Sequence, residues 1–223
     1  MPRSSGHARR ALAAGLAAAL PLLARAETAA ERDRWQRPGA VMDALGVARG
    51  SAVADVGAGD GYFTLHLARR VGPEGRVVAV DLLETELAGI RRAARESGLP
   101  QVETVRGEAD DPRLPEAALD AVLVVNSYHE MGQGAAMMRG FYRALRPGGR
   151  LGIVDKVAEP GEPEAGYRAR HAIPSTVVRA DAEAAGFRFV VAPQGFVRPR
   201  RGGEPWYFLV FERPTSGTSA PPS

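Results

Sequence analysis

The sequence predicts a doubly wound α/β fold, in which helices cover both faces of a mostly parallel β-sheet and the chain ends in an antiparallel strand pair. Short apolar runs alternate with segments of helical periodicity between residues 51 and 155, as parallel strands and crossover helices do. The last two apolar runs, residues 187–192 and 206–212, flank a link rich in Pro, Arg and Gly, which favours an antiparallel pair.

The first half of the predicted sheet is bounded by turn residues. Residues 51–56 form a short apolar strand after a glycine, and in the following helix, residues 60–71, apolar side chains recur four residues apart on one face. A Gly-Pro-Glu-Gly turn leads to a valine-rich strand at residues 76–81. The next helix, residues 84–97, is ended by a glycine and a proline before a third strand at residues 102–106.

The second half continues this alternation. Residues 119–125 are apolar nearly throughout, as expected for a strand that is buried on both faces. A helix at residues 134–145 and an Arg-Pro-Gly-Gly turn precede the fifth strand, residues 150–155. Residues 159–174 are polar and rich in Pro and Gly, so we expect a loop or lid there, followed by a helix at residues 175–185 with Ser175 as its N-cap.

Composition suits a globular domain and argues against some partners. The chain has 223 residues, of which 45% are hydrophobic, enough for one domain with a core. It has no cysteine, which excludes disulfides, thiolate metal sites and cysteine nucleophiles. Four of its 29 basic residues lie in residues 1–26, leaving 25 against 26 acidic residues in the rest. Without a positive excess in this part we expect no nucleic-acid partner.

Residues 1–26 have the organisation of a signal peptide. Three arginines precede a short apolar run at residues 11–23, and the Ala-Arg-Ala at residues 24–26 resembles a cleavage site. The run is short for a membrane-spanning helix. We therefore expect an exported, periplasmic protein with no stable membrane insertion after cleavage. The alternatives are a cytoplasmic protein and one anchored by an uncleaved leader.

Three further segments complete the expected organisation. Residues 27–46 are predicted to form an N-terminal helix, interrupted at Pro38, that closes a cofactor site. Residues 47–213 are predicted to form the main domain. Residues 214–223 contain mainly Pro, Ser, Thr and Gly, and we expect a disordered tail there.

A glycine-rich loop and two acids predict a nucleoside cofactor. Asp55 lies near the end of the first strand and is followed by Gly57, Gly59 and Gly61 at the start of a helix, where glycines permit close approach of a ligand. Asp81 ends the second strand, where a carboxylate can accept hydrogen bonds from both ribose hydroxyls. The G-x-G-x-G spacing and the preceding carboxylate favour a cofactor with cationic groups over one with a pyrophosphate.

Three segments resemble, in order and spacing, motifs of class I S-adenosylmethionine-dependent methyltransferases. They are residues 53–62 (Val-Ala-Asp-Val-Gly-Ala-Gly-Asp-Gly-Tyr), 77–81 and 145–151 (Leu-Arg-Pro-Gly-Gly-Arg-Leu), and the resemblance extends over about residues 41–212. It implies a Rossmann-like fold, S-adenosylmethionine as the cofactor, and methyl transfer to an acceptor, which we expect to be a small molecule or lipid-like. The implied cofactor-binding residues are Asp55, Gly57, Ala58, Gly59, Gly61, Tyr62, Asp81, Leu82, Glu108 and Asn126. Glu108 is implied to contact the adenine amine, and Asp110 is the alternative for that role.

The candidate catalytic residues come from two segments. His129 and Glu130 follow the fourth strand, where this family places residues of the reacting centre, and either could act as a base or orient a substrate. His171 lies in the predicted lid. A structural role for each of the three is the alternative. The segment lacks the N-P-P-Y pattern of enzymes that methylate amino groups of nucleic acids, and no metal-ligand spacing is apparent, so we expect no metal.

Two other functions compete with methyl transfer. One is an NAD(P)-dependent oxidoreductase of Rossmann type, which the glycine spacing and Asp55 disfavour. The other is a protein that binds the cofactor without catalysis. The predicted export favours this alternative, because S-adenosylmethionine is made in the cytoplasm. The sequence leaves the acceptor and the oligomeric state open.

Overall fold

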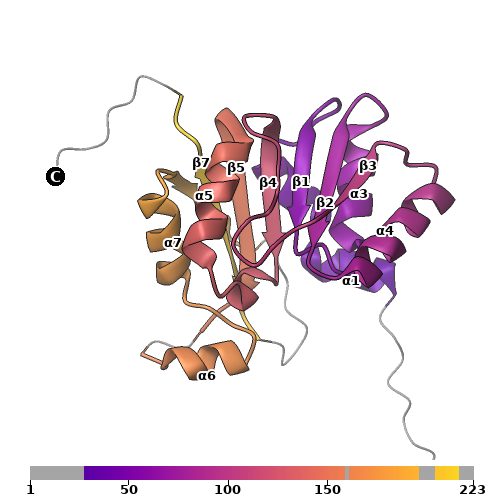
Figure 1. Cartoon of the computed structure of the whole chain (residues 1–223). Helices are drawn as coiled ribbons and strands as arrows, with labels where there is room; N and C mark the ends of the chain where they lie inside the picture. The colour runs from indigo at the N-terminus through magenta and orange to yellow at the C-terminus, as the bar shows by residue number, and fades with distance from the viewer. Residues whose placement is uncertain (1–27, 159–160, 196–203, 216–223) are drawn as a thin grey trace, which may run out of the picture.

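The computed structural model describes residues 28–158, 161–195 and 204–215. The predicted signal peptide and nearly all of the predicted C-terminal tail lie outside these ranges. Within them, a helix follows every parallel strand except the third, and the sheet runs through the middle of the molecule (Figure 1).

The sheet has the strand order β3-β2-β1-β4-β5-β7-β6. Strands β1 to β5 pair in parallel, and β7 runs antiparallel to both β5 and β6. The predicted fold class is therefore confirmed. The strands are β1 (Ala52–Val56), β2 (Arg76–Asp81), β3 (Val102–Arg106), β4 (Leu119–Val125), β5 (Leu145–Lys156), β6 (Arg188–Val191) and β7 (Trp206–Glu212).

Helices cover both faces of this sheet, because successive side chains of each strand point to opposite faces and both sets are apolar. On one face, Val53 and Leu123 pack with Leu67 of α3, and on the other Val122 packs with Phe141 of α5. The helices are α1 (Ala29–Gln36), α2 (Pro38–Ala44), α3 (Tyr62–Val71), α4 (Glu84–Glu96), α5 (Gly134–Ala144), α6 (Glu164–Ala169) and α7 (Ser175–Ala184), with a 3₁₀ turn, η1 (Tyr128–Glu130). Among the described residues, none of these helices has the length and apolar character needed to cross a membrane.

The N-terminal segment forms two helices rather than one. Arg37 adopts a left-handed conformation (φ 47°) between them, and Pro38 is the first residue of α2. Proline disfavours helical geometry in the residue before it but is well placed at a helix start. The interruption expected at Pro38 is thus a change of direction, which lets α1 and α2 pack separately.

Three expectations for the second half were wrong. The fifth strand begins at Leu145 instead of residue 150, because the expected turn hydrogen-bonds within the sheet: the Gly148 amide donates to the Arg213 carbonyl (2.7 Å), and the Arg213 amide donates to Gly149 (2.9 Å). The pairing of β4 with β5 shifts register there, so the turn residues form a bulge. The expected loop at residues 159–174 contains α6, which is held to the core by the buried Tyr167. Pro174, not Ser175, is the N-cap of α7.

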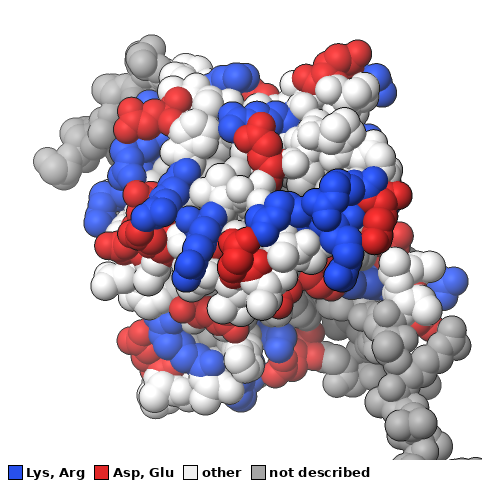
Figure 2. All heavy atoms as spheres, turned by 45° about the vertical axis from the view of Figure 1, so that its right-hand side comes forward, with Lys and Arg blue, Asp and Glu red and all other residues white. Residues whose placement is uncertain are grey.

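Charged side chains of both signs are interspersed on the surface that carries β3 and α4 (Figure 2). Arg76 pairs with Glu103 across β2 and β3 (2.7 Å), and Arg91 pairs with Glu84 within α4. Exposed pairs of this kind contribute only about 0–1 kcal/mol each to stability. The expectation that no nucleic acid binds this protein stays a prediction.

Candidate active site

Two cavities meet where the carboxyl ends of β1 and β4 lie side by side. The strand order reverses between these two strands, and ligands of doubly wound folds bind at such a point. The larger cavity has a volume of about 530 Å³ and the smaller about 220 Å³. Both are lined by Gly57, Gly59 and Asn126. The glycine loop therefore separates two compartments of one continuous site.

Asp81 is held firmly at the wall of the larger cavity. One carboxylate oxygen accepts a hydrogen bond from the Gly59 amide (2.9 Å), and the other accepts from the Leu83 amide (3.0 Å). Leu82, which is 53% exposed, and Glu108, which is ion-paired with Arg113, line the same cavity. The structure thus brings together Asp81, Leu82 and Glu108, three of the residues that the resemblance assigned to cofactor binding.

The glycine loop passes so close to the end of β4 that only glycine fits at its first position. Gly57 has φ +70°, and a Cβ atom there would lie 1.9 Å from the Ser127 hydroxyl oxygen. Gly61 has a different role: it lines neither of the two cavities, and a Cβ there would lie 2.8 Å from Ile90. Gly61 thus allows α4 to pack against the loop, and its contact with the cofactor stays a prediction.

The smaller cavity gathers charges of both signs. Asp55 is fully buried and accepts a hydrogen bond from the Thr64 hydroxyl (2.6 Å). Arg32 of α1 forms an ion pair with Asp60 (2.7 Å), and all three charged residues line this cavity. Asp60 also accepts from the Tyr62 amide (3.1 Å) at the start of α3. A carboxylate thus occupies the helix N-terminus where a dinucleotide fold would place a pyrophosphate.

Helix α1 is fixed over the smaller cavity. Its first turn has a capping box between Thr28 and Glu31. The Arg32 guanidinium lies 3.9 Å from the centre of the Tyr62 ring, and the Tyr62 hydroxyl donates to Asp33 (2.6 Å). Arg32 was not predicted from the sequence, since its contacts with the loop come from distant parts of the chain. That α1 closes the cofactor site stays a prediction.

Asp55 makes the stability of this protein depend on pH. Burial raises the pKa of its carboxyl from 3.8 to about 6, against the opposing effect of the Thr64 hydrogen bond. The folded state therefore holds a proton on Asp55 more tightly than the unfolded state does. Stability should fall as the pH rises from about 4 to about 6, by about 3 kcal/mol in total for this group, and stay lower above that range.

The Asp55→Asn variant should lack this contribution. The free energy of unfolding of wild type minus that of the variant is expected to be larger at pH 4.5 than at pH 8, as measured by denaturant unfolding. The exposed Asp110→Asn is the matched control and should show no such trend. A constant difference between wild type and Asp55→Asn across the range would contradict the prediction.

The three predicted catalytic residues lie together. His129 and Glu130 are in η1, and His171 follows α6; their ligand-type side-chain atoms all lie within 4.8 Å of one another. His129 Nε2 is 3.6 Å and His171 Nδ1 is 3.5 Å from the Glu130 carboxylate. Glu130 lines the larger cavity, so this cluster lies at its end.

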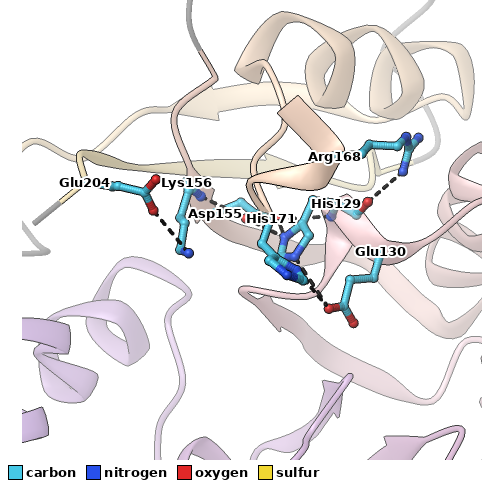
Figure 3. Close-up of polar contacts among 7 residues, drawn as sticks. All are labelled: His129, Glu130, Asp155, Lys156, Arg168, His171 and Glu204. Atoms are coloured by element: carbon cyan, nitrogen blue, oxygen red, sulfur yellow. Dashed lines mark hydrogen bonds and ion pairs between the residues drawn. The ribbon is translucent and has the colours of Figure 1, made fainter. Parts of the chain in front are cut away.

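Asp155, at the end of β5, orients this cluster (Figure 3). Its fully buried carboxylate lies 2.9 Å from Nδ1 of the buried His129 and accepts a hydrogen bond from the His129 amide (3.1 Å). Arg168 of α6 donates to the His129 carbonyl (2.6 Å). Asp155 was missed in the sequence, although an acid that ends an apolar strand was the signal used for Asp81.

Comparison with known proteins finds similarity to methyltransferases. The family described as a methyltransferase domain matches residues 53–149. A demethylmenaquinone methyltransferase from Listeria welshimeri is 29% identical over 130 residues, which are 58% of this chain and 54% of the relative. A ubiquinone/menaquinone biosynthesis C-methyltransferase from Escherichia fergusonii is 32% identical over 122 residues, or 54% and 48% of the two chains. The chain thus spans about half the length of these relatives.

A solved structure agrees in fold. The crystal structure of an S-adenosylmethionine-dependent methyltransferase from Aquifex aeolicus matches 81% of this chain and 92% of its own, with a TM-score of 0.67 and 23% sequence identity. At this identity the match shows a common fold.

Proposed function

We propose that this chain is a class I S-adenosylmethionine-dependent methyltransferase, which transfers a methyl group from this cofactor to a small-molecule or lipid-like acceptor. The match to a methyltransferase domain supports the predicted family and cofactor. The observation that carries the proposal of activity is the larger cavity, which runs from Asp81 to Glu130. A cofactor bound at one end would present its methyl group toward the cluster at the other.

The residues of the two cavities fit the cofactor group by group. In the larger cavity, the Asp81 carboxylate suits the ribose hydroxyls, and Leu82 and Glu108 suit the adenine ring and its amine. In the smaller cavity, Asp55 suits an ammonium group and Arg32 suits a carboxylate, which together match the amino-acid end. When bound, S-adenosylmethionine supplies a methyl group on an electrophilic sulfonium.

The charges in the smaller cavity also favour S-adenosylmethionine over a nicotinamide dinucleotide. A nicotinamide dinucleotide would place two phosphates near the glycine loop, where Asp55 and Asp60 present carboxylates and the start of α3 is already capped by Asp60. Like charges at that distance disfavour the complex. The arrangement supports a cationic cofactor.

The acceptor end combines polar groups with an apolar wall. His129, Glu130 and His171 are candidates to accept the proton that an acceptor O–H or acidic C–H loses. Met131 and Met137 line the same cavity, and Leu83 at its rim is 58% exposed. We therefore propose an acceptor with an apolar body and an ionisable group, a description that fits the quinone precursors implied by the names of the two relatives.

Binding and turnover test the proposal separately. We expect calorimetric titration to show binding of S-adenosylhomocysteine and no saturable binding of NADH. Incubation with S-adenosylmethionine labelled in the methyl group should label material in cell-envelope extracts. Tight NADH binding with no response to S-adenosylhomocysteine would refute the methyltransferase proposal. Cofactor binding without transfer to any extract would favour the non-catalytic alternative.

We also propose that residues 1–26 direct export and are removed, on the sequence pattern alone. Mass spectrometry of the N-terminus of the protein isolated from cells tests this. A mature chain that starts at Glu27 in the periplasmic fraction is expected. Recovery of the intact leader in the cytoplasmic fraction would contradict it.

A further inference from the structure

The cluster at the acceptor end has the geometry of a metal site. Two imidazole nitrogens, His129 Nε2 and His171 Nδ1, lie 3.6 Å and 3.5 Å from the same oxygen of Glu130. Around a tetrahedral ion with bonds of about 2.1 Å, ligand atoms are separated by about 3.4 Å. All three ligand atoms lie within 4.8 Å of one another, so one ion could contact them after side-chain movements that bring the imidazole nitrogens into place.

The environment of His129 fixes which nitrogen is available. Asp155 lies at hydrogen-bond distance from Nδ1 and also accepts from the Lys156 amide (2.8 Å), so this buried carboxylate is well supplied with donors. A proton on Nδ1 directed to Asp155 leaves the lone pair of Nε2 facing Glu130 and His171. Histidines that bind metals commonly donate their other N–H to a carboxylate in this way.

The backbone of His171 is held in place, and its side chain is 63% exposed. Its backbone has φ +53°, a conformation that side-chain-bearing residues rarely adopt, and its amide donates to the Arg168 carbonyl (2.9 Å). Arg168 in turn donates to the His129 carbonyl, and the two histidine rings lie 5.4 Å apart (Figure 3). Strained residues persist where their surroundings fix them, often at functional sites.

We propose that His129, Glu130 and His171 bind one divalent transition-metal ion of the zinc type. Two histidines and one glutamate are a ligand set of catalytic zinc sites, which keep an open position for water or substrate. Here Glu130 lines the larger cavity, so the open position would face the acceptor. This inference departs from the expectation of no metal, because His171 is far from the other two ligands in sequence.

The ion would also select the acceptor of the proposed methyl transfer. A divalent ion favours the deprotonated form of an oxygen bound to it. An acceptor hydroxyl would lose its proton to water, and its electron pair would become available for the methyl group without a change in oxidation state. This role rests on the proposed methyl transfer, whereas the metal site itself rests on the side-chain geometry alone.

Metal binding can be measured without any acceptor. Full-length protein that has been treated with chelator and dialysed is titrated with Zn²⁺ by calorimetry and with Co²⁺ by visible absorption. One ion per chain is expected. Asp155→Asn should weaken binding by about 10- to 100-fold, and Glu130→Gln and His171→Asn, which remove ligands at the exposed side of the site, should weaken it more.

Matched substitutions elsewhere are the controls. His66→Asn in α3 and Glu183→Gln in α7 change the same residue types outside the cluster and should bind the ion as wild type does. Absence of stoichiometric binding, or wild-type affinity in both Glu130→Gln and His171→Asn, would overturn the metal site. Binding of S-adenosylhomocysteine, measured in parallel with chelator present, tests the proposed function independently, so that either idea can fail alone.

Discussion

Replacement of Gly57 by valine is expected to abolish cofactor binding and to lower the free energy of unfolding by about 2–5 kcal/mol. The residue has φ +70°, and the left-handed conformation costs about 1–2 kcal/mol for a residue with a Cβ atom. Its Cβ would also lie 1.9 Å and 2.6 Å from the Oγ and Cβ atoms of Ser127, and relief of such overlap costs about 1–3 kcal/mol more. Because Gly57 lines both cavities, the displaced loop would disturb both ends of the cofactor site.

Further substitutions separate the overlap with Ser127 from the cost of the backbone conformation. Ser127→Gly removes both atoms that a Cβ on Gly57 would meet. Gly57→Ala should therefore lower the free energy of unfolding less in the Ser127→Gly background than in wild type. Gly89→Ala in the middle of α4, where a Cβ meets open space, should instead stabilise the protein by about 0.5–1 kcal/mol. Denaturant unfolding and S-adenosylhomocysteine calorimetry measure both effects. Wild-type stability in Gly57→Val would refute the steric argument.

The sequence predicted the sheet well because its strands are short apolar runs with clear ends. The bounds of β2, β3, β4 and β7 coincide with the predicted ones, and each follows a turn or loop residue that limits the run. Helix α6 could not be predicted in this way. It has only six residues, and its position depends on tertiary contacts: the burial of Tyr167 and the hydrogen bond from Arg168 to η1.

The site shows the same contrast between local and distant signals. Asp55, Asp81 and Glu108 follow or end strands, so their positions at the carboxyl edge of the sheet follow from the order of the strands. Arg32 reaches the site from a helix outside the sheet, and His171 from a segment after the last parallel strand. Their meeting with the other residues depends on how these segments pack, which the spacing of residues along the chain does not specify.

Replacement of Asp81 by alanine is expected to weaken binding of S-adenosylhomocysteine by at least tenfold. Each hydrogen bond to a charged group contributes about 1.5–3 kcal/mol, and 1.4 kcal/mol is a factor of ten in affinity. The Asp81 carboxylate can contribute in two ways: by contact with the ribose, and by holding the loop through the Gly59 and Leu83 amides. Calorimetry gives the affinity, with Glu96→Ala, which changes an exposed acid at the end of α4, as the control. Unchanged affinity in Asp81→Ala would remove this residue from the cofactor site.

A ligand that lacks one ribose hydroxyl distinguishes direct contact from support of the loop. If Asp81 contacts the ribose, loss of the 2′-hydroxyl should weaken binding to wild type but have little further effect in Asp81→Ala, because the interaction is already absent. If Asp81 only holds the loop through Gly59 and Leu83, the hydroxyl should matter equally in both proteins. Asp81→Asn retains one oxygen acceptor but loses the charge. If the charge strengthens the ribose contact, this variant should bind with an affinity between those of wild type and Asp81→Ala. Loss of the 2′-hydroxyl should then weaken its binding less than it weakens binding to wild type.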